Sequence, residues 1–141
     1  MDELWLIGRI LFCGLFIGSG IGHFVDLEGS TQYAAARGVG PARPGVIVSG
    51  VAYIVGGVSV LFGIWGDLGA LLLIVTLIPL TFVMHQFWAE RDPRAKQTEL
   101  SMFMKNIALI GGCALLFSWF ARDTFGIGLP YTVTDGAFSF R

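Results

Sequence analysis

The chain has 141 residues, of which 55% are hydrophobic and only 13% are charged. In an ordinary soluble domain roughly a quarter of the residues are charged. The low charged fraction and the mean hydropathy of +0.74 therefore exclude such a domain. A net charge of -1 gives no basic surface for nucleic acid, so no nucleic-acid partner is expected.

Four stretches are long and apolar enough to cross a bilayer, whose core of roughly 30 Å needs about 20 helical residues. They run from about residues 4–25, 46–65, 68–88 and 102–120. Strand periodicity is absent, and backbone groups in lipid must be paired within the segment, which favours helices. We therefore predict one all-α domain over residues 1–141, an integral membrane antiparallel four-helix bundle in contact with the lipid bilayer.

The first predicted span, residues 4–25, begins MDELW, with acidic residues where a signal peptide has basic ones, so we interpret it as an anchor. Gly14, Gly18 and Gly22 form a small-xxx-small series, which predicts close packing against a neighbouring helix. A second stripe lies largely opposite that series. It contains Arg9, Cys13, Phe16, Gly20 and His23.

The loop after the first span has two interpretations. Ser30 or Thr31 is suited to cap a short helix that Gly38 ends, lying over one mouth of the bundle. A disordered connector is the alternative.

Small residues also mark the later spans. Ser49, Gly56 and Gly63 recur at seven-residue spacing in the second span and predict one closely packed face. Pro79 is expected to kink the third span. A charged loop is expected from residues 89–101.

Polar residues converge on one side of the membrane if the spans alternate. His23 ends the first span, His85 lies near the end of the third, and Lys105 lies near the start of the fourth, so a polar pocket is predicted where they meet. The same layer contains Asp26, Trp88, Glu90, Arg91 and Asn106.

Each of the residues proposed for the polar pocket also has a purely structural interpretation. Lys105 and Arg9 have stems long enough to reach the headgroups, and Trp88 suits an interfacial belt. The histidines are able to bond a neighbouring helix as neutral imidazoles.

The cysteines and the possible metal ligands give little sign of thiol or metal chemistry. Cys13 and Cys113 fall at similar depth but lack a CxxC spacing, so small buried hydrophobes are a simpler interpretation than a thiol pair. No spacing of metal ligands is present in the sequence, so no metal site is predicted.

Basic residues favour one orientation. The side with the first and third loops carries more of them, which predicts that this side is cytoplasmic and that both termini are outside. The loop side has Arg37, Arg43, Arg91, Arg94, Lys96 and Lys105, and the other side has Arg9, Arg122 and Arg141.

Three segments carry a family resemblance: LIGRILFCGLFIGSGIGHF, HQFWAERDP and ELSMFMKNIALIGG. Together they resemble the DoxX family of small four-span bacterial membrane proteins, from about residue 4 to residue 119. The resemblance implies a four-helix bundle in the bacterial cytoplasmic (inner) membrane. The positions that match the signature of the family are Arg9, Gly20, His23, His85, Phe87, Trp88, Lys105, Asn106 and Gly111.

The family takes its name from a subunit of a thiosulfate:quinone oxidoreductase, and some relatives are associated with membrane redox complexes and with thiol or oxidative stress. With the polar layer, this resemblance favours a membrane subunit that binds quinone. His85, His23 and Lys105 would donate and relay protons. The candidate cofactor-binding residues are Trp88 and Phe87, which would flank the ring, with Asn106 and Arg9.

The sequence has no flavin fingerprint, CxxC or haem motif, so electrons would come from a partner protein, and other membrane subunits or further copies of the chain are the expected partners. Whether the chain is itself an enzyme is left open. The alternative function is a non-catalytic accessory or assembly subunit whose glycine faces dock onto a larger complex. A small-solute transporter or a lipid-binding protein ranks below both, because we find no inverted repeat.

Overall fold

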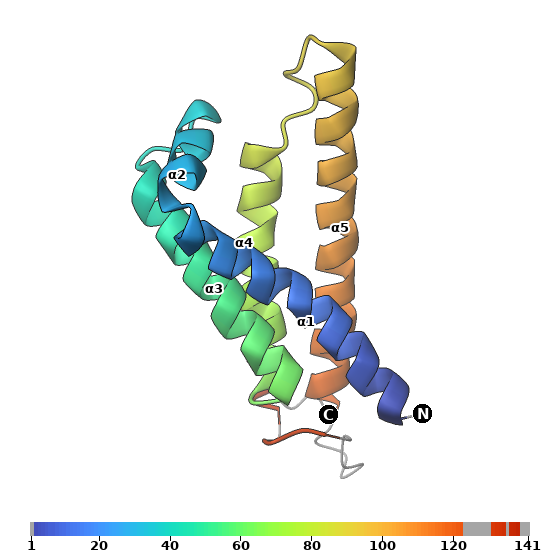
Figure 1. Cartoon of the computed structure of the whole chain (residues 1–141). Coiled ribbons are helices and arrows are strands. Elements are labelled where there is room, and N and C mark those ends of the chain that lie inside the picture. Colours follow the sequence, from blue (N-terminus) through green and yellow to red (C-terminus); the bar gives the residue numbers. More distant parts are fainter. Residues whose placement is uncertain (1, 123–130, 135, 139–141) are drawn as a thin grey trace.

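The computed structural model describes residues 2–122, 131–134 and 136–138 (Figure 1). Those residues form five helices and contain no strand. The helices are α1 (Asp2–Val25), α2 (Leu27–Ala36), α3 (Ala42–Phe62), α4 (Gly66–Met84) and α5 (Pro93–Ala121).

The prediction of an all-α membrane fold is confirmed. α1, α3, α4 and α5 are each long and apolar enough to cross a membrane, and they alternate in direction along the chain (Figure 1). Their bounds differ from the predicted ones, most of all for the last span. The side chain of Asp92 accepts a hydrogen bond from the Ala95 amide at 2.8 Å and Pro93 follows it, so α5 begins there rather than near residue 102. Much of the predicted charged loop is thus the first turns of α5.

The short helix predicted in the first loop is present as α2, and the disordered connector is not. Its start was wrong, however. Asp26 is the N-cap, and its Oδ1 accepts a hydrogen bond from the Gly29 amide at 3.0 Å, so the helix begins at Leu27, ahead of Ser30 and Thr31. The chain leaves α2 through Gly38, whose φ of 84° lies in the left-handed region.

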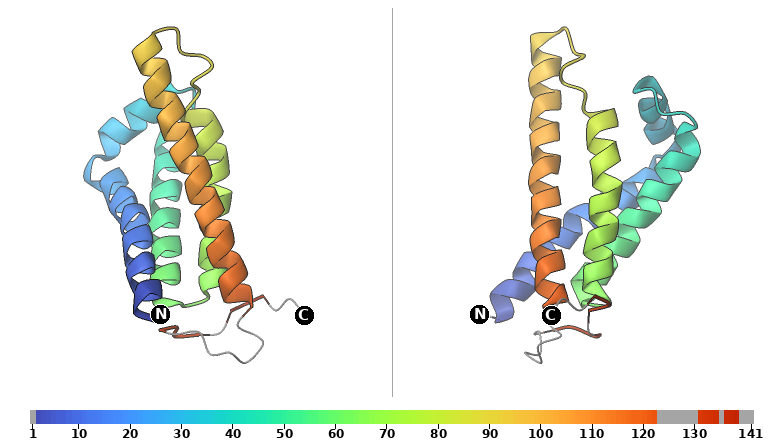
Figure 2. Two further views of the ribbon diagram at one scale, coloured as in Figure 1. Left: turned by 90° about the vertical axis from the view of Figure 1, so that its right-hand side faces the viewer. Right: turned by 180° about the vertical axis from the view of Figure 1, so that it is seen from behind.

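The long helices pack in series: α1 lies on α3, α3 on α4 and α4 on α5. α1 and α3 lean away from α4 and α5 toward the end of the molecule where α2 lies, and α2 rests on α3 at that end (Figure 2). The buried core between the long helices includes Phe16, Val60, Leu73 and Phe120. Cys13 and Cys113 belong to the same core, and both are free and buried.

The glycine series of α1 does not pack as predicted. A Cβ atom added at Gly14, Gly18 or Gly22 would meet nothing within 4 Å among the described residues, so this face points outward. The opposite stripe turns inward instead, and a Cβ at Gly20 would lie 2.7 Å from the Gly50 carbonyl oxygen. The buried stripe of Arg9, Cys13, Phe16 and Gly20 sets this rotation of α1.

The prediction for the second span is confirmed at its centre. A Cβ at Gly56 would lie 2.8 Å from Leu73 and 3.1 Å from the Gly69 carbonyl oxygen, so α3 and α4 approach closely here. Gly63 has another role, because it ends α3 with a φ of 62°.

Candidate functional site

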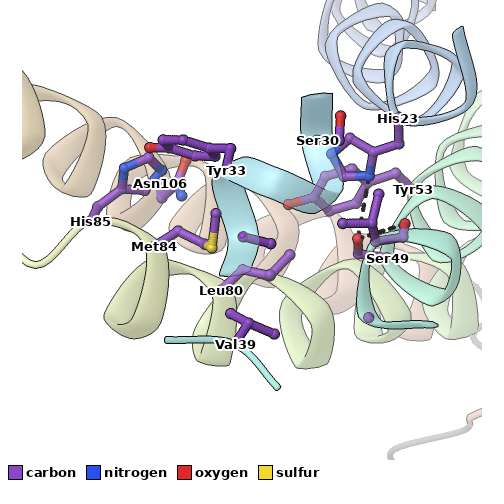
Figure 3. Close-up of a pocket in the computed structure, with 13 residues that line it drawn as sticks. His23, Ser30, Tyr33, Val39, Ser49, Tyr53, Leu80, Met84, His85 and Asn106 are labelled. Atoms are coloured by element: carbon purple, nitrogen blue, oxygen red, sulfur yellow. Dashed lines mark hydrogen bonds between the residues drawn. The ribbon is translucent and has the colours of Figure 1, made fainter. Parts of the chain in front are cut away.

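A pocket of about 220 Å³ lies at the end of the bundle where α2 crosses (Figure 3). All five helices or the residues next to them contribute to its wall. Met84 and Leu80 lie between its two polar ends, and Val39 and Val46 also line it (Figure 3). Its polar lining consists of His23, Ser30, Tyr33, Ser49, Tyr53, His85 and Asn106. The volume is below that of pockets for drug-sized ligands, and it suits a single substituted ring.

One polar end of the pocket is formed by α1 and α3. His23 lies in the last turn of α1, and its Nδ1 is 3.2 Å from the Ser49 hydroxyl oxygen on α3. The Ser49 hydroxyl donates to the Val46 carbonyl oxygen at 3.1 Å. The His23 and Tyr53 rings lie 5.8 Å apart. In Figure 3 these side chains occupy one side of the view.

The other end is built where α4 stops. His85 is the C-cap of α4, and its amide bonds to the Thr81 carbonyl oxygen at 3.2 Å. The His85 ring projects toward α5, where its Nδ1 lies 2.8 Å from Oε2 of Glu99. Figure 3 shows His85 with Tyr33 and Asn106 on the side away from His23. The pocket therefore has a histidine at each end.

Arg37, the residue that ends α2, joins this second end to the short helix. Its Nη2 donates to Oε1 of Glu99 at 2.5 Å, and its Nη1 donates to Oε1 of Glu90 at 2.9 Å. Burial lowers the pKa of Arg37, but Tyr33, Glu99 and Glu90 outweigh that effect, so the pKa is raised overall. The guanidinium thus keeps its charge at any working pH, and the ion pairs fasten α2 above the pocket.

Two buried polar side chains of the pocket have no hydrogen-bond partner within the part of the chain that the structure describes. Asn106 is only 6% exposed and lines the pocket from α5. Tyr53 is 9% exposed and lines it from α3. Buried amides and hydroxyls are normally hydrogen-bonded, so both are available to a ligand.

The structure brings together three of the predicted site residues: His23, His85 and Asn106 line one pocket. Lys105 does not join them. It is exposed and turned one helical step, about 100°, away from the neighbouring Asn106, which places its side chain outside the bundle.

The remaining predicted site residues lie apart from this pocket. Phe87 and Trp88 pack edge to face at 5.1 Å in an aromatic group with Phe103, and Trp88 is 52% exposed. Arg9 is buried near the opposite end of the bundle, where its Nη2 donates to the Tyr131 carbonyl oxygen at 2.8 Å. Neither aromatic residue lines the pocket, because both pack against Phe103 of α5 instead.

Sequence reasoning missed several residues of the pocket and its surroundings. Tyr33 and Tyr53 were not singled out, Ser49 was noted only for its size, and Arg37 only for its charge. A signal for Glu99 was present: it lies seven positions before Asn106, two helical turns along the same face. In contrast, no sequence pattern near Arg37 indicated that it pairs with Glu99 of α5.

These features define a class: a small helical membrane protein with four spans and a polar pocket at one end. The family model for DoxX matches residues 4–86, and this chain belongs to the DoxX family. The inner membrane protein YqjF of Escherichia coli (strain K12) is 34% identical over 113 residues, covering 79% of each chain. No solved structure matches.

Membership of this family and the four spans make the chain a multi-pass protein of the bacterial inner membrane. The family-model match ends just after His85 and so does not include Glu99 or Asn106.

Proposed function

We propose that this protein is a membrane subunit that binds a quinone headgroup in the pocket beneath α2. The observation that carries the proposal is the arrangement of the lining, with polar groups at two ends and an apolar middle. A quinone ring has the matching pattern, with oxygen atoms on opposite sides of a flat apolar ring. The isoprenoid tail would leave between the helices toward lipid.

The surroundings of His85 suit it to exchange protons with a ligand. Glu99 accepts from the His85 ring, and Arg37 holds that carboxylate in place. Quinone and quinol interconvert by gaining or losing protons as well as electrons, so a site for them needs a group such as His85 that exchanges protons. Electrons would pass to or from a partner protein, since the sequence carries no flavin or haem motif.

Quinone binding by two matched variants tests the proposal. Purified protein in nanodiscs would be titrated with ubiquinone-1 and menadione while tryptophan and tyrosine fluorescence is followed. Asn106→Leu removes a polar group from the pocket at similar volume, and we expect it to weaken binding about tenfold or more. Lys105→Met changes the next residue, which faces outward, and should bind as the wild type does.

The proposal fails if the wild type shows no saturable quinone binding. It also fails if Asn106→Leu and Lys105→Met bind quinone equally well, because the ligand would then be held elsewhere.

One observation favours the accessory-subunit function as a second candidate. The α1 face with Gly14, Gly18 and Gly22 is outward and unoccupied among the described residues, and a helix of another subunit could approach it closely. Gly18→Leu should then abolish a larger species on native gels of membranes that contain the protein at its natural level. The same change at Gly111, which also meets nothing within 4 Å, is the control. Equal migration of both variants and the wild type would count against this function.

A further inference from the structure

We propose that the pocket selects the reduced, hydroquinone form of its ligand over the oxidised quinone when both histidines are neutral. This inference rests on the proposed function and adds to it the redox state that the site recognises. It follows from the hydrogen-bonding partners of the two histidines, each of which fixes the position of the ring proton.

At His23 a single hydroxyl proton determines the tautomer. The Ser49 hydroxyl has only one, and it is donated to the Val46 carbonyl oxygen at 3.1 Å. Ser49 Oγ must therefore accept in its 3.2 Å contact with His23. The proton of neutral His23 consequently lies on Nδ1, which leaves Nε2 as a hydrogen-bond acceptor.

At His85 the charge of the neighbouring carboxylate determines the tautomer. Glu99 accepts from the Arg37 guanidinium through Oε1 and contacts His85 Nδ1 through Oε2 at 2.8 Å. A carboxylate held by arginine has no proton to donate, so His85 donates from Nδ1. When His85 is neutral, its Nε2 is also an acceptor.

Both ends of the pocket thus offer an imidazole nitrogen without a proton. A hydroquinone has two hydroxyl groups able to donate to these nitrogens, whereas the carbonyl oxygens of a quinone would face two lone pairs. Asn106 adapts to either form because its amide both donates and accepts. Tighter binding of the reduced form would in turn make a bound quinone easier to reduce, since binding and reduction are linked.

The preference holds for neutral histidines and is lost when they are charged. The charged or titratable groups around His85 are Glu99 on α5, Arg37 and Tyr33 on α2, and Glu90 in the preceding loop. Around His23 the titratable neighbour is Tyr53 on α3. An imidazolium carries a proton on both ring nitrogens, so both then donate and a quinone carbonyl would be accepted in that state.

Anaerobic titration of the nanodisc protein with ubiquinol-1 and ubiquinone-1 tests this selection. At pH 8 we expect ubiquinol-1 to bind about tenfold more tightly or better. If ubiquinone-1 binds as tightly as ubiquinol-1 at pH 8, the inference is overturned while the proposed function stands. If neither form binds, both are overturned.

Nitrogen-15 NMR of labelled histidine tests the cause without any ligand. The chain has only two histidines, so His23→Phe and His85→Phe assign the signals. In the wild type near pH 8, both rings should carry their proton on Nδ1. The inference is overturned if either one carries it on Nε2.

Three variants extend that measurement. Ser49→Ala should change the spectrum of His23 alone, and Glu99→Gln that of His85 alone. Glu28→Gln removes a carboxylate from the exposed pair with Arg43 and should change neither. A Glu99→Gln protein with an unaltered His85 signal would contradict the assigned role of Glu99 as a positioning residue.

Discussion

Arg37 at the end of α2 donates from Nη2 to Oε1 of Glu99 on α5, at 2.5 Å. Apart from this contact and the neighbouring pair with Glu90, α2 rests mainly on α3. The guanidinium therefore connects the first half of the chain to the last helix at the end where the two halves lean apart (Figure 2). The same carboxylate orients His85, so one ion pair both holds α2 over the pocket and arranges the pocket's lining.

Removing this guanidinium should loosen α2 in particular. In Arg37→Met, Glu90 and Glu99 lose their cation, and we expect a loss of about 1–2 kcal/mol, smaller than for a fully buried pair because these side chains are partly exposed. Hydrogen exchange by mass spectrometry should rise in residues 27–36 and little in α4. Arg43→Met, which removes an exposed pair at 3.7 Å, is the control. Equal exchange in the two variants would show that the Arg37 pairs do not hold α2.

Two glycines in one helix should respond oppositely to the same change. A Cβ at Gly20 would lie 2.7 Å from a backbone oxygen of α3, so Gly20→Ala must separate the helices and should cost about 1–3 kcal/mol. Gly18→Ala meets nothing within 4 Å and should be neutral or stabilising, because alanine favours helix by about 1 kcal/mol. Thermal unfolding followed by circular dichroism measures both. A similar Tm for the two variants would argue against the close approach of α1 and α3.

The sequence was sufficient for the spans but not for their rotation. Hydropathy located the four long helices because each must cover the bilayer with apolar residues. It also separated the two stripes of α1, but it did not reveal which stripe faces the core. Lipid is as apolar as the core, so hydrophobicity does not distinguish the two sides of a membrane helix.

The same difficulty explains what was missed at the pocket. Lys105 and Asn106 are neighbours in sequence, and only the packing of α5 on α4 decides which of them points inward. The pairing of Arg37 with Glu99 joins residues 62 positions apart, and no local pattern predicts such a contact.

The two cysteines should be unreactive in the folded protein. Cys13 and Cys113 are fully buried in the core, where a reagent has no access and the thiolate is poorly solvated. We expect a maleimide to modify neither at neutral pH until the protein is unfolded in detergent. Lys96→Cys places a thiol on the exposed first part of α5 and is the positive control. Fast modification of either native cysteine would mean that the core opens readily.

The side of the membrane on which the pocket opens can be measured with the same reagents. The loop side carries more basic residues than the other side, which favours a cytoplasmic location for it. These residues are Arg37, Arg43, Arg91, Arg94, Lys96 and Lys105. A membrane-impermeant maleimide should therefore leave Lys96→Cys unmodified in intact spheroplasts and label it once the membrane is opened. Glu3→Cys, at the other end of α1, should be labelled in both. The reverse pattern would place the ion pair of Arg37 and Glu99 on the outer side together with His85, and any proton that His85 exchanges would come from there.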